Sequence, residues 1–172
     1  MTLRIVTIGA AAAAMALLIA QFLHHPTDTP PRASGRTTPT ATAHWRSMQV
    51  AIPRNWSELR RTPQYAAWTD ASRMHTVTLG NAPIADGDLS TILDGAARAL
   101  ELHLPKARVS SVRATGSRGE IRLTTHAQGH MLYITQSWHR DARAGYDQIA
   151  TWTSADGTWP IPPIAPQNHR SS

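Results

Sequence analysis

The sequence contains no cysteine, a single lysine and a single phenylalanine in 172 residues. The absence of cysteine excludes disulfides, thiolate metal sites, thiol nucleophiles and a lipid-modified cysteine. A domain of this kind depends on its hydrophobic core for stability. Lys106 is the only lysine, so the formal net charge of +6 comes almost entirely from arginine. Apart from Arg60-Arg61 the arginines are scattered, and no basic run marks a nucleic-acid surface. We therefore expect no nucleic-acid partner.

An apolar segment lies near the N-terminus. Residues 5–23 carry no charged side chain, and a run of about 20 apolar residues spans a bilayer as a helix. Arg4 precedes the run, so the positive-inside rule places residues 1–4 in the cytoplasm and the rest of the chain outside. A cleaved signal peptide is the alternative, but Leu18-Ile19-Ala20 puts a bulky residue at the start of its cleavage site. We favour an uncleaved signal-anchor in the cell membrane, in contact with the lipid bilayer.

Three further regions follow the predicted anchor. Residues 24–43 are rich in proline and threonine without a large apolar side chain, which predicts an extended linker. Residues 44–158 have the alternating and helical patterns of a folded domain. Residues 159–172 form a proline-rich tail that is unsuited to the centre of a sheet.

The folded region is predicted to be α+β. One amphipathic helix is expected to begin after Asp88, which can cap it, and to end before Pro105. Period-two alternation and turn residues predict strands on both sides of this helix. Their expected ranges are 48–52, 65–69, 74–79, 107–114, 120–125, 131–138 and 146–153. This order favours one antiparallel β-sheet with the main amphipathic helix packed on its apolar face.

The stretch Val50-Ala51-Ile52-Pro53-Arg54-Asn55-Trp56 resembles the opening motif of Mog1/PsbP-like domains. Arg60-Arg61, an aromatic strand at 65–68, Ala82-Pro83-Ile84 and Asp88-Leu89 follow in a similar order. In detail the chain most resembles the C-terminal domain of actinobacterial type VII secretion-associated proteins, and more distantly LpqN-type envelope proteins. It departs from the former in having a single anchor in place of a large N-terminal domain, and in lacking a glycine-cysteine pair. The resemblance implies a non-enzymatic accessory role, with no catalytic residues and no cofactor.

Tryptophan and arginine mark a candidate partner-binding surface. Trp45 and Trp159 lie at the two ends of the predicted domain, and Arg46, Arg60 and Arg61 are near in sequence. Exposed tryptophan beside arginine is typical of protein interfaces, so these residues are the candidates for partner binding. The alternative, which we favour for the two tryptophans, is that they close the ends of the sheet.

Histidines provide a weaker candidate for metal binding. If His126 and His130 flank a three-residue hairpin loop, their imidazoles face each other across the ladder and begin a zinc site. Such a site needs further ligands, for which His75 and His139 are available. The alternative is two solvated turn histidines. Asp86-Gly87-Asp88 does not start an EF-hand, because Thr91 and Ala97 stand at the sixth and twelfth positions.

Three functional hypotheses follow. The first is a membrane-anchored extracytoplasmic accessory protein of type VII secretion, with membrane or secretion-apparatus proteins as partners. The second is an envelope-binding module for anionic polymer or lipid, because arginine suits phosphate and carboxylate. The third and weakest is a metal-dependent hydrolase built on His126 and His130. No Gly-x-Ser-x-Gly elbow and no Ser-x-x-Lys motif is present, so we expect a protein that is not an enzyme.

Overall fold

A computed structural model describes residues 40–127 and 129–158. The predicted membrane segment at 5–23 and the tail at 159–172 lie outside these residues. Within the described ranges, no helix is long and apolar enough to cross a membrane.

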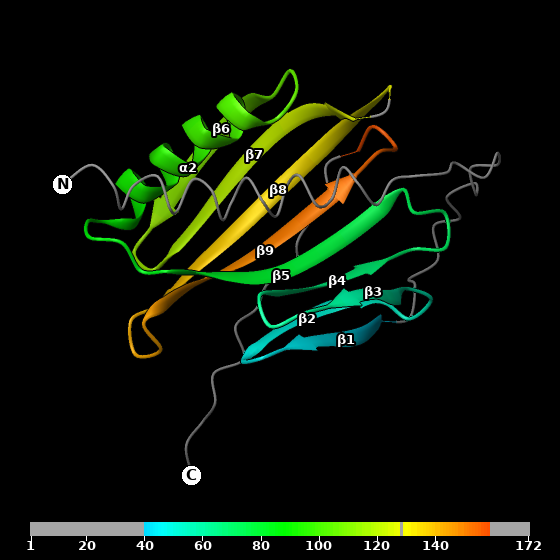
Figure 1. Ribbon diagram of the computed structural model, residues 1–172, viewed down its shortest axis with the longest axis horizontal. Helices are drawn as coiled ribbons and strands as arrows, with labels where there is room; N and C mark the ends of the chain where they lie inside the picture. The colour runs from blue at the N-terminus through cyan, green and yellow to red at the C-terminus, as the bar shows by residue number, and fades with distance from the viewer. Residues whose placement is uncertain (1–39, 128, 159–172) are drawn as a thin grey trace, which may run out of the picture.

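Seven strands form one antiparallel sheet in the order β3-β4-β5-β9-β8-β7-β6 (Figure 1). β3, β4 and β5 are consecutive neighbours, as are β6 to β9, and the two groups are joined where β5 pairs with β9. The last four strands thus form an antiparallel meander, and the predicted antiparallel pairing of the sheet is confirmed. The bounds are β3 Ser57–Arg61, β4 Tyr65–Thr69, β5 His75–Pro83, β6 Arg108–Thr115, β7 Arg118–Ala127, β8 His130–Asp141 and β9 Tyr146–Ser154.

The single described helix, α2 (Leu89–His103), connects β5 to β6 and packs over β6 and β7 (Figure 1). Asp88 caps it as predicted, since its Oδ1 accepts from the Thr91 amide at 2.7 Å. The apolar face of α2 packs on one face of the sheet, here called the helix-side face, and the two form the first core. The buried residues of this core include Leu89, Ile92, Leu93, Ala96, Leu100, Ile121, Leu123, Ile134, Trp138 and Ile149.

Beyond β8 this helix-side face becomes largely polar, although Ile149 of β9 and Ala82 of β5 still belong to the first core. Alternation along the strands places Thr78, Thr151 and Gln136 opposite one another on β5, β9 and β8. Thr76 and Thr153 form the next cross-strand pair on the same side. The helix therefore covers an apolar half of the sheet, and the other half of that face is lined by polar side chains.

A two-stranded hairpin forms a second layer on the opposite face, which the prediction of a single sheet did not include. β1 (Thr40–Trp45) pairs with β2 (Met48–Pro53), and the hairpin buries one side against β4, β5 and β9. This second core contains Ala43, Trp45, Met48, Val50, Ile52, Ala66, Trp68, Val77, Leu79, Ala150 and Trp152. β1 starts at Thr40, so the last four residues of the predicted linker are part of the folded domain.

Two leucines on α2 test the first core directly. Leu100 is 0% exposed, whereas Leu102 on the same helix is 79% exposed. We expect Leu100→Ala to lower the free energy of unfolding by about 2–5 kcal/mol, because it leaves a cavity. Leu102→Ala should change it by no more than about 0.5 kcal/mol. Denaturant unfolding of both variants measures this difference, and equal effects would contradict the packing described.

Candidate functional site

Trp45 lies in the second core and not on the surface. Its side chain is 4% exposed, and its Nε1 donates to the carbonyl of Thr62 at 3.3 Å. The structure therefore contradicts Trp45 as an exposed binding residue and agrees with the alternative in which it packs inside the domain. The physical reason is the unpredicted β1, whose alternation turns Trp45 and Ala43 inward toward β4. Trp159, its expected counterpart, lies outside the described residues.

Arg46 and Arg61 both bridge the hairpin and the β3–β4 pair. Arg46 Nη2 donates to the carbonyl of Pro63 at 2.7 Å, and its guanidinium lies 4.9 Å from the centre of the Trp45 ring. Arg61 Nη2 donates to the carbonyl of His44 at 3.0 Å and its guanidinium lies 5.6 Å from the Trp68 ring. These contacts hold the hairpin against the sheet, while both side chains remain exposed to solvent.

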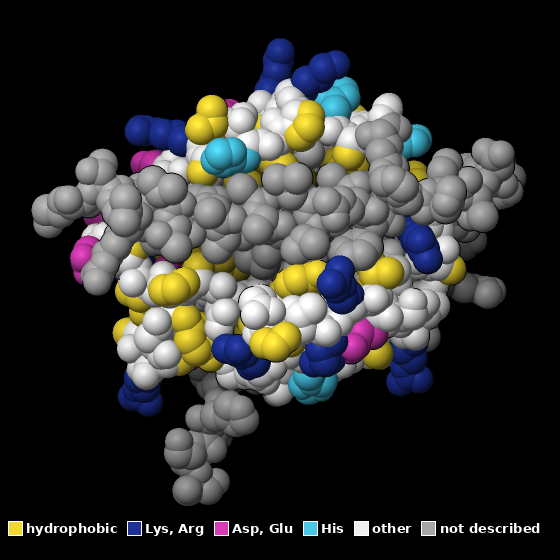
Figure 2. Space-filling model, in the orientation of Figure 1, with side chains coloured by type: hydrophobic (Ala, Val, Ile, Leu, Met, Phe, Trp, Pro, Cys, Tyr) yellow, Lys and Arg dark blue, Asp and Glu magenta, His cyan; other side chains and the backbone are white. Residues whose placement is uncertain are grey.

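Glu58 is the only acidic residue between residues 40 and 69. Its carboxylate accepts from Arg61 Nη2 at 2.6 Å, a hydrogen bond that lowers the pKa of Glu58. The same span contains four exposed arginines. We call this margin of the molecule the arginine edge and define it as Arg46, Arg54, Arg60 and Arg61. Figure 2 shows dark-blue side chains gathered over the part of the molecule where β1, β2 and β3 lie in Figure 1.

The four arginines differ in their contacts. Arg60 pairs with Ala67 and Arg61 with Ala66, so their side chains leave opposite sides of β3. The structure thus brings Arg46 and Arg61 together with Trp45, and separates Arg60 from them. Arg54, which the sequence analysis did not select, donates from Nε to the carbonyl of Thr40 at 3.2 Å. Within the described residues, neither Arg54 nor Arg60 forms a salt bridge.

His126 and His130 do not face each other. His126 pairs with Met131 and His130 with Ala127, which places the two imidazoles on opposite faces of the β7–β8 ladder. The hairpin loop has two residues and not three, and a shift of one residue reverses the side. In residues 40–127 and 129–158, no group of three or more His, Asp or Glu side chains has an arrangement that could hold a metal ion. The proposed start of a zinc site is therefore wrong.

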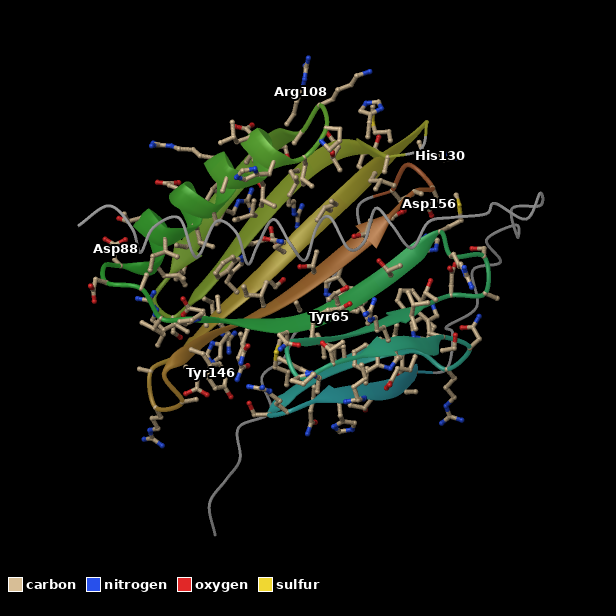
Figure 3. The ribbon with its side chains drawn as sticks, viewed as in Figure 1. Tyr65, Asp88, Arg108, His130, Tyr146 and Asp156 are labelled. Carbon is tan, nitrogen blue, oxygen red and sulfur yellow. The ribbon has the colours of Figure 1, made fainter. Side chains whose placement is uncertain are left out.

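A three-residue charged cluster that the sequence analysis missed lies at one end of the sheet. His75 Nδ1 is 2.9 Å from Asp70 Oδ2, and His75 Nε2 is 2.9 Å from Asp156 Oδ2. Trp56 stacks over the imidazole with ring centroids 6.5 Å apart and planes 29° apart. Asp156 lies where β9 ends, at the other end of the strand from Tyr146 (Figure 3).

The contacts within this cluster shift the pKa values of Asp70, His75 and Asp156. The hydrogen bond to Asp70 raises the pKa of His75, against burial and with help from Asp156. Burial raises the pKa of Asp70, but hydrogen bonds from His75 and Ser72 outweigh it and the net shift is downward. Burial likewise raises the pKa of Asp156, while bonds from Ser154, Thr158 and His75 bring it well below its ordinary value. Both carboxylates are therefore ionised near neutral pH, and the imidazole keeps its proton to a higher pH than an ordinary histidine does.

The fold is that of known Mog1 structures. The Ran-binding protein Mog1p of Saccharomyces cerevisiae superimposes with a TM-score of 0.55 and 11% sequence identity over 69% of this chain and 78% of that chain. A point mutant of Mog1 gives a TM-score of 0.55 at 12% identity over the same shares. LpqN of Mycobacterium tuberculosis, involved in cell envelope biogenesis, gives 0.42 at 14% identity over 71% and 75%. No family model and no curated protein matches the sequence. The chain therefore has a Mog1/PsbP-like fold.

Substitution of Trp45 separates a core role from an exposed binding role. We expect Trp45→Ala to lower the free energy of unfolding by about 3–5 kcal/mol, because the side chain is 4% exposed and fills the second core. Arg60→Ala, on the exposed edge, should change it by no more than about 0.5 kcal/mol. Thermal or denaturant unfolding gives both values. A stable Trp45→Ala variant would contradict the burial of this side chain.

Proposed function

We propose that this chain is a membrane-tethered binding protein whose domain works outside the cytoplasm and docks to an acidic partner surface through the arginine edge. The observation that carries the proposal is the charge of this edge: four exposed arginines and one carboxylate, which is already paired with Arg61. Exposed guanidinium groups are enriched where proteins bind carboxylates and phosphates.

The position of the edge in the chain supports this proposal. β1 begins at Thr40, directly after the predicted linker, so the hairpin belongs to the tethered end of the domain. Residues 24–39, fully extended, would span at most about 55 Å from the end of the predicted anchor. The arginine edge would thus remain within reach of the membrane surface and of proteins embedded in it.

The fold and the sequence motif support binding in place of catalysis. Mog1p is a Ran-binding protein, and we transfer only its binding character to this chain. The Pro53-x-x-Trp56 motif resembles that of actinobacterial type VII secretion-associated proteins. We therefore propose a membrane protein of that secretion apparatus as the partner, which makes the chain an accessory protein and not an enzyme.

Arg54 and Arg60 favour a second candidate function. Since neither is paired with a carboxylate in the described residues, both are available to phosphate groups. The second candidate is therefore binding of anionic lipid or envelope polymer at the same edge. It is distinguished from the first by the identity of the cross-linked partner.

A charge-removal pair tests the arginine edge. We expect Arg54→Ala with Arg60→Ala to reduce in-cell cross-linking of the full-length protein to its membrane partner by roughly three- to tenfold, because each exposed charge pair contributes about 0.2–1 kcal/mol. The matched control is Arg113→Ala with Arg118→Ala, two exposed arginines on the distant β6–β7 hairpin.

The products are read by affinity capture and mass spectrometry at native expression level. Unchanged capture by the Arg54/Arg60 variant, or equal loss in the control, would contradict a role for the arginine edge. Flotation with vesicles containing anionic lipid tests the second candidate. Binding that survives high salt would argue against it, because exposed charge pairs are screened.

A further inference from the structure

The cluster around His75 connects three segments that are far apart in the sequence. Asp70 follows β4, His75 is the first residue of β5, and Asp156 lies two residues beyond β9. The pairing of His75 with Ser154 in the β5–β9 ladder brings Asp156 to the imidazole. Trp56, from the segment between β2 and β3, covers the ring and also contacts Trp152, with ring centroids 6.3 Å apart.

Only one protonation state of His75 satisfies this geometry. A carboxylate oxygen lies 2.9 Å from each ring nitrogen, and an ionised carboxylate can only accept hydrogen bonds. The charged imidazolium donates from both nitrogens. A neutral imidazole donates from one and turns a lone pair toward the other carboxylate, which is repulsive. Loss of the proton therefore breaks one of the two bridges.

Each carboxylate is oriented toward the ring by further hydrogen bonds from residues close to it in the sequence. Asp70 also accepts from Ser72 Oγ at 2.7 Å and from the His75 amide at 3.3 Å. Asp156 also accepts from the hydroxyl of Ser154 and from the Thr158 amide at 2.9 Å. These bonds direct one oxygen of each carboxylate at the imidazolium. The bond from Thr158 moves with Asp156, so it does not prevent Asp156 from separating from His75.

The charged groups around the ring are few. Asp70 faces it from the β4–β5 turn and Asp156 from the segment after β9, while Trp56 contributes an uncharged ring. Arg73, in the same turn as Asp70, is exposed, and no contact between it and the imidazole is seen in the described residues. The electrostatic environment of the ring is therefore set by two carboxylates, which favour the charged imidazolium.

We propose that Asp70, His75 and Asp156 form a pH-sensitive clamp, which is closed while His75 is charged and holds residues 156–158 against the β4–β5 turn. Ser154 and Ala155 stay on the sheet through the β5–β9 ladder and the bond from the Ala155 amide to the Met74 carbonyl. When His75 loses its proton, the bridge to Asp156 opens and residues 156–158 separate from the turn. The clamp thereby makes the start of the C-terminal segment responsive to the pH on the side of the membrane where the domain lies.

The direction of the response follows from the three shifts. The pKa of His75 is raised, so its stabilising contribution is complete below the ordinary value of 6.5 and is lost as pH rises through the folded value. The pKa values of Asp70 and Asp156 are lowered, so their contributions are present above 3.8 and are lost as pH falls through the folded values. The clamp is closed at pH values above the folded pKa values of the two carboxylates and below the folded pKa of His75. It opens as the pH rises through the folded pKa of His75.

Two signals in the full-length protein report the clamp. The first is the titration of the His75 ring by NMR, for which we expect a midpoint above 6.5 in the protein and a fall of that midpoint in Asp156→Asn. The second is exchange of the Thr158 amide, whose hydrogen bond to Asp156 Oδ1 lies in the segment that the clamp holds. The matched reference is the Ala144 amide, which donates to Asp141 Oδ1 at 3.0 Å in the β8–β9 turn, remote from His75.

We expect Thr158 exchange, relative to Ala144, to accelerate at least threefold as His75 titrates. His75→Gln should exchange fast at every pH, whereas His44→Gln, at an exposed histidine, should behave as the unmodified protein. A His75 midpoint at or below 6.5, or a constant Thr158 to Ala144 ratio across the titration, would overturn the proposal. Because Asp156→Asn retains the imidazole under Trp56, it keeps the test decisive if His75→Gln does not fold.

Discussion

The antiparallel pairing of β5 with β9 is the contact on which the rest of the structure depends. It joins two groups of consecutive strands into one sheet, and α2 is the connection that allows both groups to be antiparallel. The pairs Val77–Trp152 and Leu79–Ala150 form the apolar surface of the sheet on which the β1–β2 hairpin packs. Ile149, on the other side of β9, belongs to the helix-side core. The same ladder brings Asp156 to His75. Both cores and the charged cluster therefore require this one register.

The two cores supply the apolar packing that stabilises a domain without disulfides. α2 covers the β6 and β7 side of one face, and the β1–β2 hairpin covers β4, β5 and β9 on the other. Burial on both faces gives each half of the sheet its own apolar cover. The arginine edge follows from this arrangement, because Arg46 and Arg61 hold the hairpin in place through backbone carbonyls while their charges stay in solvent.

The elements with strong local signals could be predicted from the sequence. The helix after Asp88 and the strand 65–69 coincide with α2 and β4, because a cap and a clear period leave little choice. β1 and β3 were missed. The sequence TATAHW resembles the proline- and threonine-rich segment before it, and SELRR is a polar edge strand without an apolar period. β5 also runs through Gly80 to Pro83, since pairing with β9 overrides the local turn signal.

The candidate site was less accessible to prediction, because it depends on register and on burial. Whether Trp45 is exposed or packed could not be decided from the sequence while β1 was unknown. The separation of His126 from His130 depends on one residue of loop length. The bridge from His75 to Asp156 spans 81 positions and has no sequence motif. Asp70 and His75 flank one turn, which is the only local signal that the cluster offers.

We propose that the domain lies outside the cytoplasm, tethered next to its arginine edge, and the suggested partners depend on this location. Its most direct test is a reporter that is active only outside the cytoplasm, fused after Ser172 of the full-length chain and combined with size analysis of the product. If the domain lies outside the cytoplasm on an uncleaved anchor, we expect an active reporter on a full-length, membrane-bound protein. A reporter that is inactive and found on the cytoplasmic side would contradict it, because the arginine edge would then face a different set of partners.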